Sequence, residues 1–210
     1  ETIERDQYRH NQFSNGLKIG YSYTTDKIEA KAGAFHQFLR DTSKKPLLNN
    51  SFSANQQFVT PYADFSYVPN WRVRFNLSYS MGKQVPNINS LNPYVDTTVP
   101  GEIFYGNPNL KPQTTQDISL SSNFRIGKFN FNASSTHSFG KDIILRHSFL
   151  KDNILNKTFN NVGKRFENLT KIGTSSKITP TTWMRLDASL YYTDYAATEY
   201  YNRNKGFTFS

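Results

Sequence analysis

The sequence predicts an all-β protein, folded as an antiparallel up-and-down meander of about nine or ten strands, without a convincing helix. Three observations lead to this fold class. Apolar and polar residues alternate over long stretches, short and long connections follow each other in turn, and aromatic residues reach 15% although only 36% of the chain is hydrophobic. A polar chain with many tyrosines and phenylalanines is expected to form half-buried strands and not to be disordered.

The clearest predicted strand is residues 71–82, WRVRFNLSYSMG. One parity holds apolar residues, namely Trp71, Val73, Phe75, Leu77, Tyr79 and Met81. The other parity holds Arg72, Arg74, Asn76, Ser78 and Ser80. Successive strand side chains point to opposite faces, so this segment has one apolar face and one polar face.

The same alternation returns in other parts of the chain. It is present at residues 17–23, more weakly at 28–34, and again at 118–124, 129–133 and 183–192. In the last of these, Met184, Leu186, Ala188, Leu190 and Tyr192 alternate with Arg185, Asp187 and Ser189. Each of these segments is predicted to be a strand.

The predicted connections come in two sizes that alternate. Short turns are expected at Thr25–Asp26, Pro69–Asn70, Gly127–Lys128 and Pro180–Thr181. Long polar loops are expected near residues 40–57, 83–113, 150–163 and 193–206. An up-and-down meander then has all its short turns at one end and its long loops at the other. A soluble sandwich has no reason to be so asymmetric.

Aromatic residues flank the short turns. Tyr23, Tyr67 and Phe124 precede three of them, and Trp71, Phe129 and Trp183 follow three. Single aromatic residues in strands usually pack in a core, but six beside one class of turn favour a membrane-interface belt. With strands long enough for a tilted crossing of roughly 9–11 residues, the pattern predicts part of a transmembrane β-barrel, with apolar faces toward outer-membrane lipid.

A dense strand breaker, FYGNPNLKPQ, lies late in the longest loop. Its residues Gly106, Asn107, Pro108, Leu110 and Pro112 resemble the Gly-Asn-Pro-x-Leu-x-Pro-Glu signature of TonB-dependent receptors. Two further stretches resemble motifs of the same receptors, SMGKQVPNINSLNP at residues 80–93 and FNNVGK at residues 159–164. The chain departs from the pattern at Gln113, usually glutamate, and at Val85, usually alanine.

The resemblance carries expectations about the whole protein. Such receptors are bacterial outer-membrane barrels of about 22 strands with a plugged lumen, so residues 1–210 are expected to be a single β-barrel segment, a fragment without the plug domain or the barrel C-terminus. The overall texture is most similar to barrels of Bacteroidota. The implied activity is uptake of a siderophore complex, a cobalamin-like cofactor or an oligosaccharide. The implied partners are a plug domain, a TonB-type energy-coupling protein and, as a further candidate, a surface lipoprotein.

Aromatic residues of the outer loops are candidate ligand-binding residues, because large solutes are gripped by aromatic platforms. They are Tyr94, Phe104 and Tyr105 in the longest loop, and Tyr195, Tyr200 and Tyr201 in the last. Four charged residues, Arg72, Arg74, Arg185 and Asp187, are expected to face the lumen and to pair with one another or with a plug.

Other functions find little support in the sequence. The net charge of +9 comes from scattered basic residues, which does not favour a nucleic-acid surface. No cofactor motif or catalytic motif is present, so an enzyme is not expected. The four histidines, His10, His36, His137 and His147, lack metal-ligand spacing. Two alternatives remain open, a small complete outer-membrane barrel with a structural or adhesion role, and a soluble all-β carbohydrate-binding module with an apolar core.

Overall fold

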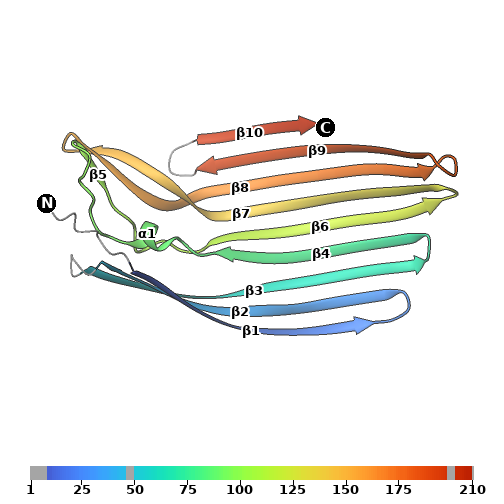
Figure 1. Cartoon of the computed structure of the whole chain (residues 1–210), viewed down its shortest axis with the longest axis horizontal. Helices are drawn as coiled ribbons and strands as arrows, with labels where there is room; N and C mark the ends of the chain where they lie inside the picture. Colours follow the sequence, from blue (N-terminus) through green and yellow to red (C-terminus); the bar gives the residue numbers. More distant parts are fainter. Residues whose placement is uncertain (1–8, 46–49, 198–201, 210) are drawn as a thin grey trace.

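The strands of the chain form one curved sheet, seen in the computed structural model, which describes residues 9–45, 50–197 and 202–209. The strand order is β1-β2-β3-β4-β6-β7-β8-β9-β10, and β5 pairs with β8 off that path (Figure 1). Every pair on the path is antiparallel. The predicted all-β antiparallel meander is therefore confirmed.

The strands are long compared with those of globular proteins. They are β1 (Arg9–Thr24), β2 (Ile28–Lys45), β3 (Asn50–Asn70), β4 (Val73–Gln84), β5 (Glu102–Phe104), β6 (Gln113–Ile126), β7 (Phe129–Lys151), β8 (Ile154–Lys177), β9 (Trp183–Ala197) and β10 (Asn202–Phe209). One short helix, α1 (Ile88–Leu91), lies where the sequence predicted only a loop. No helix in the described residues has the length and apolar character to cross a membrane.

The four connections predicted as short turns lie at one end of the sheet, on the right in Figure 1, whereas the two-residue turn between β7 and β8 lies at the opposite end. Three of them fall where they were predicted, and Gly127 in one of these has a positive φ of 59° that suits glycine. The fourth is shifted. Pro69 and Asn70 still belong to β3, and the turn consists of Trp71 and Arg72. Arg72 is therefore a turn residue and does not belong to the polar face of a strand.

Three of the four predicted long loops are wrong, because strands run through most of them. The predicted loop at residues 150–163 is instead the end of a hairpin whose turn is Asp152–Asn153, both with positive φ. Aspartate and asparagine tolerate this backbone conformation. In the segments predicted as loops at residues 40–57 and 193–206, β2 continues to Lys45 and β9 to Ala197. Among the connections that the structure describes, only the one at residues 85–112 is long.

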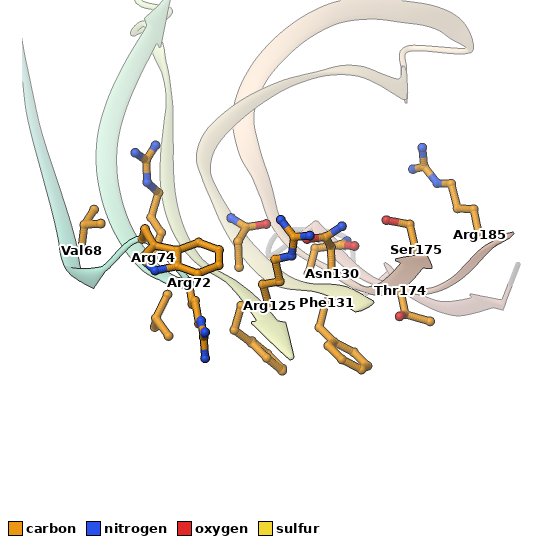
Figure 2. A pocket seen from close by; sticks show the side chains of 14 residues that line it. Val68, Arg72, Arg74, Arg125, Asn130, Phe131, Thr174, Ser175 and Arg185 are labelled. Carbon is orange, nitrogen blue, oxygen red and sulfur yellow. The ribbon is translucent and has the colours of Figure 1, made fainter. Parts of the chain in front are cut away.

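The two faces of the sheet differ in chemistry. One row of paired residues is Val73, Phe124, Phe131, Thr174 and Leu186, and the adjacent row is Arg74, Asn123, Asn132, Gly173 and Asp187. Figure 2 shows Arg74, Asn130 and Ser175 on the inner side of the curved wall, with Phe131 and Thr174 on the opposite side. We call these the concave face and the convex face.

The large apolar side chains of the convex face are not packed against a second layer. Leu77 is 46% exposed, Leu120 55% and Ile172 62%. Within the described residues the sheet is a single layer, so its apolar face does not close into a core. This arrangement does not support the soluble module, in which the apolar faces would meet.

A small core does form under the long connection. Ile88, Leu91 and Leu110 are buried, with exposed fractions of 5%, 2% and 6%. Gly106 donates its N–H to the Asn92 carbonyl at 2.9 Å, and Asn107 donates to the Ser90 carbonyl at 2.7 Å. The breaker sequence thus folds back onto α1.

The same unit includes the third motif stretch. The Asn107 side chain donates to the Phe159 carbonyl at 2.9 Å, and Asn161 donates to the Lys111 carbonyl at 2.9 Å. Gln113 Oε1 accepts the Ile144 N–H at 3.2 Å, a contact that a glutamate oxygen would also make. The three stretches that resemble receptor motifs are therefore one structural unit, which ties the long connection to β6, β7 and β8.

Candidate functional site: the concave face

A recess of about 740 Å³ lies on the concave face at the short-turn end. Arg74, Arg125 and Arg185 point into it from β4, β6 and β9 (Figure 2). The Arg185 guanidinium pairs with Asp187, with Nε and Oδ2 2.5 Å apart, as the sequence analysis expected. Arg72 lies instead in the β3–β4 turn, where its guanidinium stacks 4.8 Å from the Trp71 ring. The recess can hold anionic or hydrogen-bonding groups.

A hydrogen-bonded cluster around Glu167 lies farther along the concave face. The Glu167 carboxylate accepts hydrogen bonds from the Tyr191 hydroxyl at 2.8 Å and the Tyr195 hydroxyl at 2.7 Å. Arg165 Nε lies 3.4 Å from the same carboxylate. These residues are scattered in the sequence, and only the β8–β9 register brings them together. The sequence analysis named Tyr195 but not Glu167, because a single glutamate in a strand gives no signal.

The predicted ligand-binding residues do not form one platform. The Phe104 ring packs edge-on against Phe159 at 5.7 Å, and the Arg146 guanidinium lies 5.7 Å from Phe104. Tyr94 is exposed, and Tyr105 donates its backbone N–H to the Lys157 carbonyl. Tyr195 belongs to the cluster around Glu167, whereas Tyr200 and Tyr201 lie outside the described residues. Ligand binding by these residues stays a prediction.

Another cavity, of about 530 Å³, lies at the long-loop end and is bounded by the connection that carries α1. Its polar lining comes from four strands and from that connection, and includes Gln12, Asp41, Gln84, Asn87 and Gln113. No group of three or more histidine or acidic side chains in the described part of the chain could hold a metal ion. This cavity is thus a hydrogen-bonding site built mainly from amides.

A comparison with known proteins shows to which family the curved sheet belongs. A family model described as "Outer membrane protein beta-barrel family" matches residues 2–210. The chain belongs to the outer membrane protein beta-barrel family. This membership confirms the predicted outer-membrane localisation, and it assigns the curved sheet to the wall of a barrel whose concave face lines the lumen.

Solved structures with the same fold are similar to this barrel wall at low sequence identity. The copper transporter OprC matches with a TM-score of 0.65 and 12% identity over 90% of this chain and 30% of its own. The FrpB iron transporter from Neisseria meningitidis matches with a TM-score of 0.59 and 12% identity, covering 98% of this chain and 28% of its own. The siderophore receptor PirA from Pseudomonas aeruginosa matches with a TM-score of 0.51 and 11% identity, covering 96% and 48%.

The chain spans less than half the length of each of these structures. These structures are of transporters and a receptor. The search of curated proteins found no match. At these identities the similarity establishes the fold of an outer-membrane barrel.

The six predicted interface aromatics of the barrel wall all lie at the short-turn end. Tyr23, Tyr67, Phe124 and Phe129 share the parity of the convex face. Trp71 lies in a turn, and Trp183 pairs with Lys177 on the parity of the concave face. A membrane-interface role for the six remains a prediction, and the register makes the first four the better candidates.

A second row of aromatic residues crosses the convex face of the barrel. The sequence analysis did not predict this row. Ring centroids are 5.1 Å apart between Phe139 and Phe166, 5.9 Å between Phe166 and Tyr192, and 4.7 Å between Tyr192 and Phe207. Along β7, Phe139 lies ten residues beyond Phe129. At ~3.3 Å per residue and a tilt of ~40°, the two levels are ~25 Å apart, the height of the apolar band of an outer-membrane barrel.

Polar residues lie between the two aromatic levels, and they are the reason why the sequence did not predict the second row. Ser135, His137, Asn168 and Thr170 interrupt the apolar alternation of β7 and β8 on the convex face. The Asn168 amide donates to Ser135 Oγ at 3.1 Å, and Thr170 donates to Asn168 Oδ1 at 3.1 Å. Because these groups satisfy one another, an apolar surrounding costs them less than it would cost isolated polar groups.

Proposed function

We propose that this chain is one part of the barrel of a TonB-dependent outer-membrane receptor, which takes up a large scarce solute through a plugged lumen. The candidate solutes are a siderophore complex, a cobalamin-like cofactor and an oligosaccharide. In this proposal, the intact protein also contains a plug domain and binds a TonB-type energy-coupling protein. Outer-membrane lipid surrounds the convex face, and a surface lipoprotein is a further candidate partner.

The observation that carries the proposal is the chemistry of the concave face. Three arginines point into a recess that the side chains of the wall do not fill. Guanidinium groups retain hydrogen-bonding capacity beyond a single ion pair, and a plug domain in the lumen would supply partners for them. Similarity of the fold to a copper transporter, an iron transporter and a siderophore receptor supports a transport role.

Cysteine labelling of two neighbouring residues tests the plugged lumen. Ser175 lies on the concave face and Thr174 on the convex face (Figure 2). In the intact protein, Ser175→Cys is expected to react slowly with a membrane-impermeant maleimide, and at least about tenfold faster after deletion of the plug domain. The matched Thr174→Cys variant should show no such change, because lipid covers its face in both forms.

Equal labelling of Ser175→Cys before and after the deletion would mean an open lumen, which would favour the small barrel with a structural or adhesion role. Transport is tested separately. Accumulation of the bound solute in cells should be lost when the gene for the TonB-type protein is deleted. Uptake that continues without that protein would contradict energy coupling.

A further inference from the structure

Lysines follow the second aromatic row directly on the convex face. Phe139 on β7 pairs with Phe166 on β8. Lys141 comes two residues after Phe139, and Lys164 comes two residues before Phe166, so both share the parity of the aromatic rings. Both lysines are exposed. The barrel wall therefore carries positive charge just beyond its second aromatic level, toward the long-loop end.

A third lysine belongs to the same level. Lys83 on β4 pairs with Thr114 on β6, which in turn pairs with Lys141. The Lys83 ammonium donates to Thr114 Oγ1 at 2.6 Å, which leaves two of its N–H groups to donate to a ligand. At a strand spacing of ~4.8 Å, the Cα atoms of Lys83 and Lys141 are ~10 Å apart, so both flexible side chains can reach one anionic group.

The position of these lysines along the membrane normal matches that of lipid head groups. Two residues at ~3.3 Å each and a strand tilt of ~40° place Lys141 ~5 Å beyond Phe139. A bilayer of ~40–45 Å with a hydrocarbon core of ~30 Å has head-group layers ~5–7 Å deep. Because the aromatic level marks the edge of the apolar band, the lysines lie in the head-group layer, on the side where outer-membrane barrels face the cell exterior.

The charge of the three lysines is not neutralised by the wall itself. Among the described residues none of the three forms an ion pair, although Asp142 follows Lys141 in the chain. Lys205 on β10 has the same parity but lies opposite Asp194, so we leave it out of the site. Three ammonium groups at one level attract an anion, and lysine is a common ligand of phosphate.

We propose that Lys83, Lys141 and Lys164 form a binding site for the phosphate-bearing head group of an outer-leaflet lipid. The acyl chains of that lipid then lie along the exposed apolar side chains of the convex face, such as Leu120. The aromatic rings of Phe139 and Phe166 lie at the boundary between the acyl chains and the head group. This inference goes beyond the proposed function, because it does not depend on the transported solute or on a plug domain.

The test uses the full-length protein in micelles of an uncharged detergent, titrated with the phosphorylated glycolipid lipid A. Native mass spectrometry measures the bound fraction, and we expect a saturable complex. The triple variant Lys83→Gln, Lys141→Gln, Lys164→Gln should bind lipid A about 100-fold more weakly, about fivefold for each lysine beside an anionic head group. The double variant Lys141→Gln, Lys164→Gln keeps the hydrogen bond from Lys83 to Thr114 and should bind about 25-fold more weakly, should the triple variant assemble poorly.

The matched control removes the same amount of charge from the other face. Lys31, Lys171 and Lys177 are exposed lysines of the concave parity, and Lys171 and Lys177 belong to the same strand as Lys164. The triple variant Lys31→Gln, Lys171→Gln, Lys177→Gln should bind lipid A within about twofold of the unmodified protein. The comparison therefore separates a site on the convex face from attraction by the net charge of the protein.

Two further probes decide what the lysines recognise. Lipid A without its phosphates should bind about 100-fold more weakly than lipid A, and inorganic phosphate at millimolar concentration should leave the lipid A complex in place. The inference is wrong if no saturable complex forms, if the two triple variants bind lipid A equally, or if the dephosphorylated lipid binds as tightly. Displacement of lipid A by inorganic phosphate would also contradict it, because the site would then bind a free anion and not a lipid.

Discussion

Leu77→Arg is expected to destabilise the inserted barrel by about 2–4 kcal/mol, the cost of an arginine at the middle of the lipid-facing band. Leu77 is 46% exposed on the convex face and pairs with Leu120, which in turn pairs with Ser135 between the two aromatic levels of β7. The measurement is denaturant unfolding of the full-length protein in lipid vesicles, followed by tryptophan fluorescence.

The neighbouring residue provides the matched control. Ser78 lies on the concave face, where a long cationic side chain can reach water, so Ser78→Arg should cost well under 1 kcal/mol, about the value of a surface change. Leu186→Arg should cost about 1 kcal/mol, because Leu186 lies close to the Trp183 end of β9, near the edge of the band. Equal costs at Leu77 and Ser78 would contradict the assignment of the two faces.

Gly106→Ala is expected to open the long connection. A Cβ atom at this position would lie 2.5 Å from the Asn92 carbonyl oxygen and 2.7 Å from that of Ser90, both of them backbone atoms. These atoms belong to the hydrogen bonds that hold the breaker onto α1, so the strain cannot be relieved by a side-chain rotation. The expected cost is about 2–3 kcal/mol.

The effect should be local, so hydrogen exchange is the appropriate measurement. Amides of residues 85–112 in the full-length protein should exchange about 30-fold faster or more, the equivalent of that free energy. The control is Gly82→Ala in β4, where the nearest atom to a new Cβ is 4.0 Å away, and exchange should not accelerate. Unchanged protection in the Gly106→Ala protein would mean that the breaker does not depend on this close approach.

The alternation of residues was enough to predict which face of each crossing strand is apolar. Leu77 and Ser78 have the expected opposite parities, and the four connections predicted as short turns lie at one end as expected, although the Asp152–Asn153 turn adds a short connection at the other end. The prediction succeeded because an apolar face and a polar face impose a two-residue period directly on the side chains of a strand. Where that period was interrupted on β7 by Ser135 and His137, the second aromatic row at Phe139 was missed.

The prediction of three long loops was wrong for a related reason. Beyond the membrane band both faces of a hairpin are wet, so the apolar period disappears although the backbone ladder continues. The Asp152–Asn153 turn closes such a hairpin, and apolar residues flank it in adjacent pairs, Phe149 with Leu150 and Ile154 with Leu155, without the alternation that predicts a strand. The composition around Gly106 predicted the strand breaker, but it did not predict that the breaker packs on α1.

The sequence by itself determined the class of this protein, an outer-membrane β-strand meander with a polar side and an apolar side. It could do so because the alternation of residues within a single strand depends only on the surroundings of that strand's two faces. The tertiary structure alone decided which distant residues share a site. Strand register placed Gln12 and Asp41 at the same cavity as Gln84 and Gln113, and it joined Tyr191 and Tyr195 to Glu167. Register depends on pairing between strands, and no single strand's sequence encodes which partner residue lies opposite.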